Sequence, residues 1–274
     1  NVAYYEFDGN AEDSTTNGYN GTNTNVTWAQ GRYGTVGSFN GSSSYIDTTY
    51  NFGTDSSYSI SLWMKTSITS TRQGLFGVWI ASGSNNGPGI NFGIDASNNF
   101  EFMIANGSSN WSDTSISASS YTDGNWHNLI LVINGTSVKL YADGNTTPIA
   151  NLTSSVSAGT STSNNLALGR LGNYPGLYFN GLIDQVRIFS SALSSTDVSD
   201  LYDEQYCFDN FFNDDSTLAT YKLNNTPFDD LGYYNGTASN VTYATGKFDK
   251  AAVFNGSSSS IDLGNNSSNN NPLI

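Results

Sequence analysis

The nine residues FNGSSSYID, from Phe39 to Asp47, occur again as FNGSSSSID from Phe254 to Asp262, 215 positions later. The two stretches differ at one position, where Tyr45 in the first corresponds to Ser260 in the second. The match continues upstream, where NVTWAQGRY corresponds to NVTYATGKF. Aromatic and basic residues keep their class across the match, which indicates a duplicated structural unit and not a chance repetition of a polar word.

The period of this repeat is about the length of one domain. Residues 1–205 are enough for one all-β domain with a sizeable core, and we predict that they form the first copy. We expect a linker at residues 206–216 and the opening strands of a second, incomplete copy at 217–274. An incomplete copy has strand edges without a pairing partner. Association with other copies of the chain is therefore one expected consequence.

Charge and composition exclude several classes of function. The formal net charge of −14 comes from 23 acidic and 9 basic residues, without the Lys/Arg cluster that nucleic acid requires. Cys207 is the only cysteine, which excludes disulfides within the chain and Cys-ligated zinc. No stretch approaches 18 consecutive apolar residues, so we expect no membrane span. Fourteen Asn-x-Ser/Thr sequons fit an exported protein, extracellular or on a cell or virion surface. We expect that any signal peptide has already been removed.

Short runs of period-2 alternation dominate the chain and end at Gly, Asn, Asp or Ser, as strands joined by turns do. INGTSVKLYADG predicts a hairpin with Asn134 and Gly135 in its turn. Only Ser194 to Gln205 has helical spacing, with Val198, Leu201 and Tyr202 on one face. The pattern predicts an all-β, antiparallel two-sheet sandwich or jelly roll with one short helix after the last strand.

Several motifs in order resemble the laminin-G-like jelly-roll domain of the concanavalin A-like lectin/glucanase superfamily: YYEFDGN, GRYGTVGSFNGSSSYID, YSISLWMKT, GNWHNLILVINGTSVKLYADG and FNGLIDQVRIFSSALSSTDVSDLYDE. The resemblance covers residues 2–204 and, in abbreviated form, 218–264. It implies that the first strand, Ala3 to Phe7, pairs with the last, Leu182 to Phe189. It also identifies the repeated FNGSSSYID as the family's second-strand element.

Glucanases of this superfamily carry paired carboxylates on one strand as nucleophile and acid/base. The four glutamates, Glu6, Glu12, Glu101 and Glu204, have no such partners at alternate strand positions. His127 is the only histidine, and no nucleophile-elbow sequence accompanies it. We therefore expect a protein that is not an enzyme.

A metal site is predicted in GLIDQVRIF, where alternation places four residues on what should be the inner face: Leu182, Asp184, Val186 and Ile188. A buried carboxylate needs a partner, and calcium is one that takes carboxylate and carbonyl oxygens. The resemblance implies that Ca2+ is held by Asp184 and Asp13 with carbonyls near Asn40 and Gly41. The alternative is that Asp184 accepts backbone N–H groups.

Sugar sites combine aromatic platforms with a few Asn, Asp or Arg groups. Trp63 and Trp126 lie in strand patterns and are expected in or near the core. The ligand candidates lie in or beside polar segments and are Trp79, Trp111, Tyr121, Arg170, Asn173 and Tyr174. The alternative is that these rings close the ends of the sandwich.

These observations predict a calcium-supported, non-catalytic recognition module for a glycan or another cell-surface molecule, within an adhesin-like repeat protein. The alternative is a structural assembly unit of a surface layer, filament or viral particle that binds no small ligand. A glycoside hydrolase or lyase is disfavoured by the missing acid pair.

Overall fold

The computed structural model describes residues 1–31, 34–52, 55–78, 89–106, 108–157, 165–172, 176–212, 219, 221–229, 234–246 and 249–263, with backbone alone at 204–212, 245 and 249. The chain divides into two compact units, residues 1–202 and 203–274. No helix in these ranges combines the length and hydropathy needed to cross a membrane.

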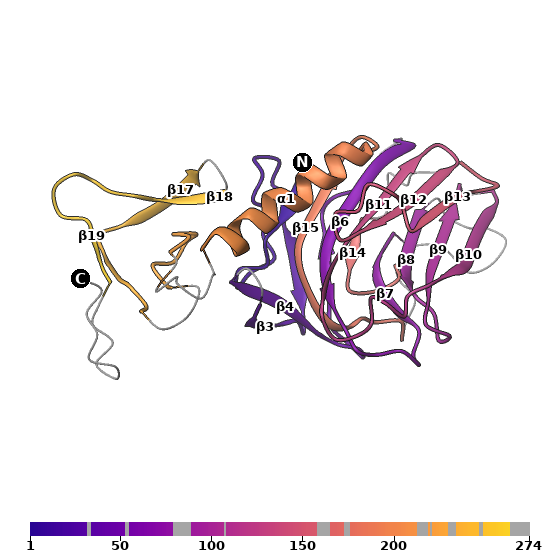
Figure 1. The fold of residues 1–274 in the computed structure, drawn as a ribbon, viewed down its shortest axis with the longest axis horizontal. Helices are drawn as coiled ribbons and strands as arrows, with labels where there is room; N and C mark the ends of the chain where they lie inside the picture. The colour runs from indigo at the N-terminus through magenta and orange to yellow at the C-terminus, as the bar shows by residue number, and fades with distance from the viewer. Residues whose placement is uncertain are drawn as a thin grey trace. The chain divides into compact units, whose positions relative to one another are not determined.

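Two antiparallel sheets pack face to face in the first unit (Figure 1). Sheet A has the spatial order β13 (Ala150–Thr153), β12 (Ser137–Ala142), β11 (Trp126–Asn134), β6 (Ser57–Lys65), β15 (Asn180–Phe189), β4 (Thr35–Asn40) and β3 (Thr27–Gln30), and β1 (Ala3–Tyr5) also pairs with β15. Sheet B has the order β10 (Asn110–Ser117), β9 (Asn99–Ala105), β8 (Gly89–Ile94), β7 (Gln73–Gly77), β14 (Ala167–Leu168), β5 (Tyr45–Thr48) and β2 (Gly21–Thr24). The predicted antiparallel jelly-roll sandwich is confirmed.

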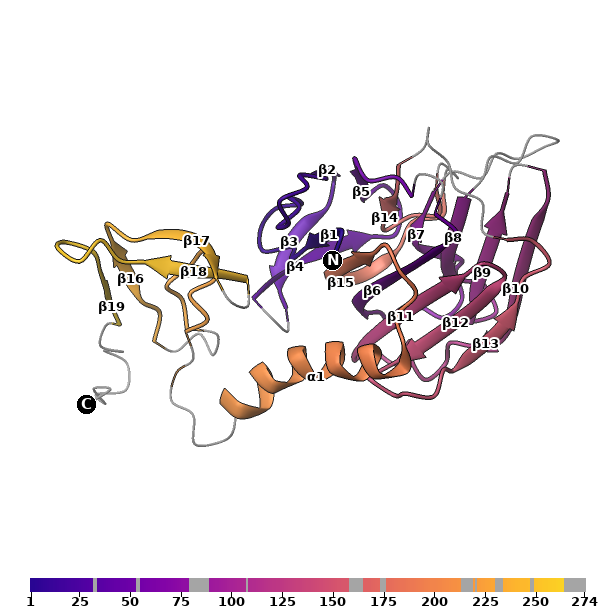
Figure 2. The same cartoon turned by 90° about the horizontal axis from the view of Figure 1, so that it is seen from above.

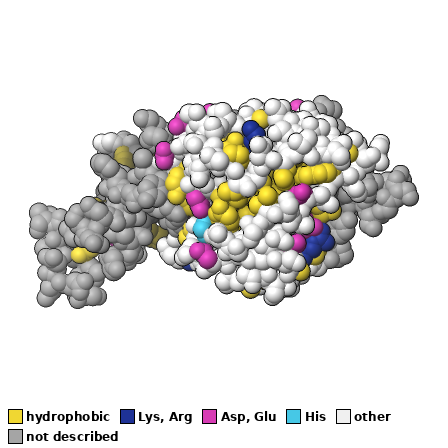
Figure 3. Space-filling model, turned by 45° about the vertical axis from the view of Figure 1, so that its right-hand side comes forward, with side chains coloured by type: hydrophobic (Ala, Val, Ile, Leu, Met, Phe, Trp, Pro, Cys, Tyr) yellow, Lys and Arg dark blue, Asp and Glu magenta, His cyan; other side chains and the backbone are white. Residues whose placement is uncertain are grey.

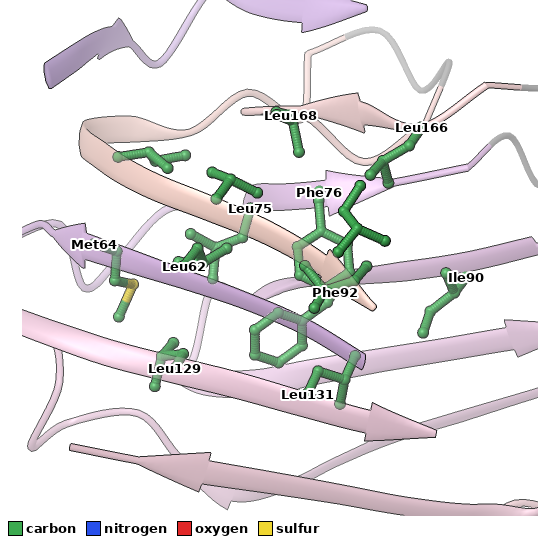
Figure 4. Packing of buried hydrophobic residues seen from close by; sticks show 14 of the residues in the cluster. Leu62, Met64, Leu75, Phe76, Ile90, Phe92, Leu129, Leu131, Leu166 and Leu168 are labelled. Carbon is green, nitrogen blue, oxygen red and sulfur yellow. The ribbon is translucent and has the colours of Figure 1, made fainter. Parts of the chain in front are cut away.

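The first strand closes the first unit on itself as predicted, because β1 pairs with β15 and places Ala3 opposite Ile188. Alternate residues of the central strands fill the space between the sheets, among them Leu62 and Met64 of β6 in sheet A and Phe76 and Phe92 in sheet B (Figure 4). Removal of this apolar surface from water is the main stabilising contribution in such a sandwich.

Helix α1 (Ser195–Phe212) covers the outer side of sheet A with its first turns (Figure 2). A second cluster of buried side chains joins them: Ile130 and Val132 of β11, Tyr141 of β12, and Val198 and Leu201 of the helix. The Tyr202 ring stacks on Trp63 at 5.5 Å between centroids. The helix runs to Phe212 instead of the predicted Gln205, because no Gly or Pro interrupts residues 195–212.

The predicted hairpin joins β11 and β12, but its turn lies one residue further along the chain than expected. Asn134 is still in the ladder, opposite Ser137, so Gly135 and Thr136 form the turn. Gly135 has a φ of 60°, which suits a primed turn with glycine at its first central position.

The second unit repeats the opening strands of the first in the same register. Its strands are β16 (Thr237–Ser239), β17 (Thr242–Gly246), β18 (Asp249–Val253) and β19 (Ser260–Asp262). Thr237 lies opposite Asp262 as Thr22 lies opposite Asp47. Strands β17 and β18 pair like β3 and β4, each residue number shifted by 215. The sequence repeat is therefore a structural repeat.

The turn formed by the sequence NGSSS explains why these residues are repeated in the second copy. The Asn40 side-chain oxygen accepts hydrogen bonds from the backbone N–H groups of residues 42–44. Asn255 does the same for residues 257–259. An asparagine followed by small residues thus builds the same turn twice.

Candidate ligand-binding site

The outer face of sheet B carries a row of residues that are small or polar, apart from one methionine. The row is defined by strand register, because the neighbours of its members along each strand, such as Ile46, Phe76 and Phe92, lie in the core. From β5 to β10 the row consists of Asp47, Ala167, Gly77, Asn91, Met103 and Ser112.

The segment that follows β14 lies on this face at residues 170–172, because glycines of β7 leave room for it. A Cβ added to Gly74 would lie 2.2 Å from the backbone nitrogen of Leu171, and one on Gly77 would lie 2.4 Å from that of Gly172. Such contacts are sterically impossible, so side chains at these positions would displace the segment.

Two tyrosines, an arginine and an aspartate meet where this segment leaves β14. The Tyr45 and Tyr178 rings stack with centroids 6.1 Å apart and an interplanar angle of 27°. The Arg170 guanidinium carbon lies 3.9 Å from the centroid of the Tyr45 ring. Arg170 Nη2 donates to Asp47 Oδ1 over 2.5 Å, and Arg170 and Tyr178 are joined by an isolated β-bridge. We term these four residues the tyrosine cluster.

The tyrosine cluster combines a fixed cation with an accessible acceptor. The Arg170 side chain is held by its ion pair and by the Tyr45 ring, and it is 14% exposed. The Asp47 side chain is 46% exposed, so its carboxylate can accept hydrogen bonds from an external hydroxyl group. Both rings are half-buried, which gives them fixed positions and leaves part of each ring accessible to solvent.

Further along the same face, Arg72 binds Glu101 through two hydrogen bonds, Nε to Oε2 at 2.6 Å and Nη2 to Oε1 at 2.7 Å. Asn91 is 1% exposed, and neither of its amide atoms has a hydrogen-bond partner among the described residues. Its amide can therefore donate and accept within this face.

The predicted ligand residues do not gather in one place. Arg170 belongs to the tyrosine cluster. Trp111 and Tyr121 pack against the core, and the Tyr121 ring lies between those of Phe100 at 5.6 Å and His127 at 5.2 Å. The remaining three candidates, Trp79, Asn173 and Tyr174, lie outside the described residues.

Sequence reasoning missed Tyr45, Asp47 and Tyr178. One signal was available, because Tyr45 is the position at which the repeated nine residues differ. Both copies keep the motif except at this aromatic residue. The residue is therefore not needed for the motif to fold.

His127 joins the loop at residues 118–125 to the end of the β11–β12 hairpin. Its Nδ1 lies 2.8 Å from Asp143 Oδ2, and its Nε2 lies 3.1 Å from Asp123 Oδ1. The hydrogen bond to Asp143 is the main cause of a raised pKa of His127. Figure 3 shows the histidine between acidic side chains, next to hydrophobic ones.

The predicted inner-face position of Asp184 is wrong. A β-bulge between Asp184 and Arg187 shifts the alternation in β15, and Gln185 has a φ of 49°. Ile183 therefore faces the core before the bulge, and Val186 and Ile188 face it afterwards. Asp184 lies opposite Trp63 on the side that α1 covers. Its Oδ1 accepts the N–H of Gln185 over 2.8 Å, as the alternative to calcium binding predicted.

The Asp13 carboxylate is also engaged within the protein. Its Oδ1 accepts the N–H groups of Tyr4 and Thr15, and its Oδ2 accepts the Thr15 hydroxyl and the N–H of Tyr19. In the described ranges, no three His, Cys, Asp or Glu side chains form a group that could hold a metal. The calcium site with Asp13, Asn40, Gly41 and Asp184 stays a prediction.

The sequence model of the Concanavalin A-like lectin/glucanases superfamily matches residues 39–199, more than half of the chain. The chain belongs to this superfamily, as the resemblance indicated. A search of curated proteins finds no significant match to the sequence.

Solved structures share the fold at low sequence identity. Domain 4 of AbnA, an extracellular arabinanase from Geobacillus stearothermophilus in complex with arabinotriose, is 24% identical with a TM-score of 0.57, covering 73% of this chain and 97% of that one. The binding domain of botulinum neurotoxin DC in complex with SialylT is 20% identical with a TM-score of 0.51, covering 74% and 50%. The binding domain of Paraclostridial Mosquitocidal Protein 1 is 16% identical with a TM-score of 0.55, covering 86% and 58%. The chain thus spans only about half of the two toxin chains.

Proposed function

We propose that residues 1–202 form a non-catalytic carbohydrate-recognition module whose glycan lies on the outer face of sheet B, beside the tyrosine cluster. The observation that carries the proposal is the tyrosine pair held rigid by Arg170 next to the exposed carboxylate of Asp47. An aromatic ring packs against the C–H face of a sugar, while a carboxylate accepts hydrogen bonds from neighbouring hydroxyls.

The structural comparisons support the class of ligand. The arabinanase domain was solved with arabinotriose, and the toxin binding domain with SialylT. Both proteins share the fold of this chain but under a quarter of its sequence, so they support a glycan without indicating which one.

The geometry around Glu101 favours binding over hydrolysis. Both of its carboxylate oxygens accept hydrogen bonds from the Arg72 guanidinium, so the carboxylate is already engaged within the protein. Glycoside hydrolysis also requires a second carboxyl group across the scissile bond. The absence of paired glutamates on strands, read from the sequence, supports the same conclusion.

The internal repeat supplies the experiment with a matched control. Tyr45→Ser gives the first copy the residue of the second copy, and Ser260→Tyr makes the reverse change. After a glycan array identifies a ligand for residues 1–274, calorimetry should show that Tyr45→Ser and Tyr178→Ala each weaken binding at least about tenfold. Ser260→Tyr should leave the affinity unchanged.

Trp111→Ala is a second control, because Trp111 packs against the core at the opposite edge of sheet B. It should lower the melting temperature and keep the affinity. If Trp111→Ala loses the ligand while Tyr45→Ser retains it, the ligand lies at the β10 edge and the proposed site is wrong.

We also propose that the module acts outside the cell or on a cell or virion surface, within an adhesin-like repeat protein. The structural duplication supports a repeat protein, and the many Asn-x-Ser/Thr sequons fit export. The alternative, an assembly unit without a small ligand, is supported by the exposed apolar surface of the second unit. It would take precedence if the array showed no ligand.

A further inference from the structure

The large hydrophobic side chains that are exposed among the described residues all belong to the second unit: Phe228, Val253, Phe254 and Leu263. Phe254 is 51% exposed, whereas its counterpart Phe39 in the first copy is 2% exposed. The two phenylalanines occupy the same position of the same nine-residue repeat. The first unit therefore shows what covers this position when the fold is closed.

In the first unit both edges of β4 are paired. One edge pairs with β3, and the other pairs antiparallel with β15, with Gly181 opposite Phe39 and Leu182 opposite Ser38. The Phe39 ring also meets the ring of Phe179, the residue just before β15, at 6.2 Å between centroids. Strand β15 thus supplies the backbone partner of β4, and the residue just before it supplies an aromatic contact for Phe39.

In the second unit β18 corresponds to β4 and keeps its pairing with β17 in the equivalent register. Among the described residues, no strand pairs with the other edge of β18. An unpaired edge beside exposed apolar side chains is a template for adding a strand.

We propose that this edge of β18, together with Phe254, binds a strand of the β15 type that comes from outside residues 1–274. The bound strand runs antiparallel to β18, places an aromatic residue against Phe254, and presents alternate apolar residues to the covered face. The segment Phe179–Phe189 has this chemistry, and its single acidic and single basic residue, Asp184 and Arg187, leave it neutral. A neutral strand is not repelled by a chain of net charge −14.

The probe is a labelled synthetic peptide with the sequence of residues 178–190, titrated against the full chain in fluorescence anisotropy. Saturable binding is expected, and Phe254→Asp should weaken it at least about tenfold because a charge replaces a buried ring. The control is the same substitution at Phe228, which is 56% exposed and corresponds to the exposed Glu12 of the first copy. Phe228→Asp should bind the peptide like the unmodified chain.

A second variant, Val253→Asp, tests the surface independently and should also weaken binding, since Val253 is exposed at the end of β18. The proposal is overturned if the peptide does not bind, or if it binds the Phe254 and Val253 variants as it binds the unmodified chain. It is also overturned if sedimentation shows that the chain dimerises through this surface, with Phe254→Asp restoring the monomer, because the occupant is then a second copy.

Discussion

Replacement of Asp13 by asparagine should lower the free energy of unfolding of the first unit by about 1.5–3 kcal/mol, with or without calcium. Asp13 is 8% exposed, and its two oxygens accept four hydrogen bonds from Tyr4, Thr15 and Tyr19. Asparagine keeps one of these oxygens. The Thr15 hydroxyl can rotate to a new partner, so its bond need not be lost. The net loss is one charge-assisted hydrogen bond from a backbone N–H. In the variant this N–H group faces the NH2 group of the asparagine and not an acceptor.

The assay is urea unfolding followed by circular dichroism, in EDTA and in excess calcium. The matched control is Glu12→Gln, the same change of carboxylate to amide at the exposed neighbouring residue, which should alter stability by less than about 0.5 kcal/mol. An equally small effect of Asp13→Asn would refute the hydrogen-bond reasoning. If calcium stabilises the unmodified chain and Asp13→Asn removes that gain, Asp13 is a calcium ligand, as the family resemblance implies.

His127 has a raised folded-state pKa, chiefly through its hydrogen bond to Asp143, so its stabilising contribution is complete below its unfolded pKa of 6.5 and is lost as pH rises through the folded value. The unfolding free energies of the unmodified chain and His127→Gln should therefore converge above that pH, and parallel pH profiles would contradict this. Gly169→Ala should destabilise by about 2–4 kcal/mol in urea unfolding, because φ is +79° and the new Cβ would lie 2.2 Å from the Phe39 ring. Gly176→Ala, with φ of +88° and open space around it, should lose only about 1 kcal/mol, and equal losses would show that the contact with Phe39 is unimportant.

The sandwich was predictable because its signals are local. Alternation along each strand depends on residues two apart, and the helical face that places Val198 and Leu201 against sheet A depends on residues three or four apart. The β-bulge in β15 was not predictable. It shifts the alternation of inward and outward residues by one position, and the sequence around Ile183, Asp184 and Val186 does not indicate this shift. The inner-face position expected for Asp184 failed for that reason.

The tyrosine cluster was hidden for a different reason. Asp47 and Arg170 are 123 positions apart in sequence, and their ion pair forms because β14 pairs with β5 across the sheet. No local pattern encodes such a contact. Polar segments were a sound guide to Arg170, but they also selected Trp111 and Tyr121, whose rings pack against the core at the edge of the sandwich.

The two copies separate the requirements of folding from those of binding. Asn40 and Asn255 make equivalent turns, and β16 pairs with β19 in the register of β2 and β5, although Ser260 stands where Tyr45 stands in the first copy. A tyrosine is therefore not needed to form this part of the fold. In the first copy the ring contacts Arg170 and Tyr178, both contributed by the segment that follows β14. Tyr45 therefore contributes an ordered aromatic surface beside that segment. The proposed glycan site requires an ordered surface of this type.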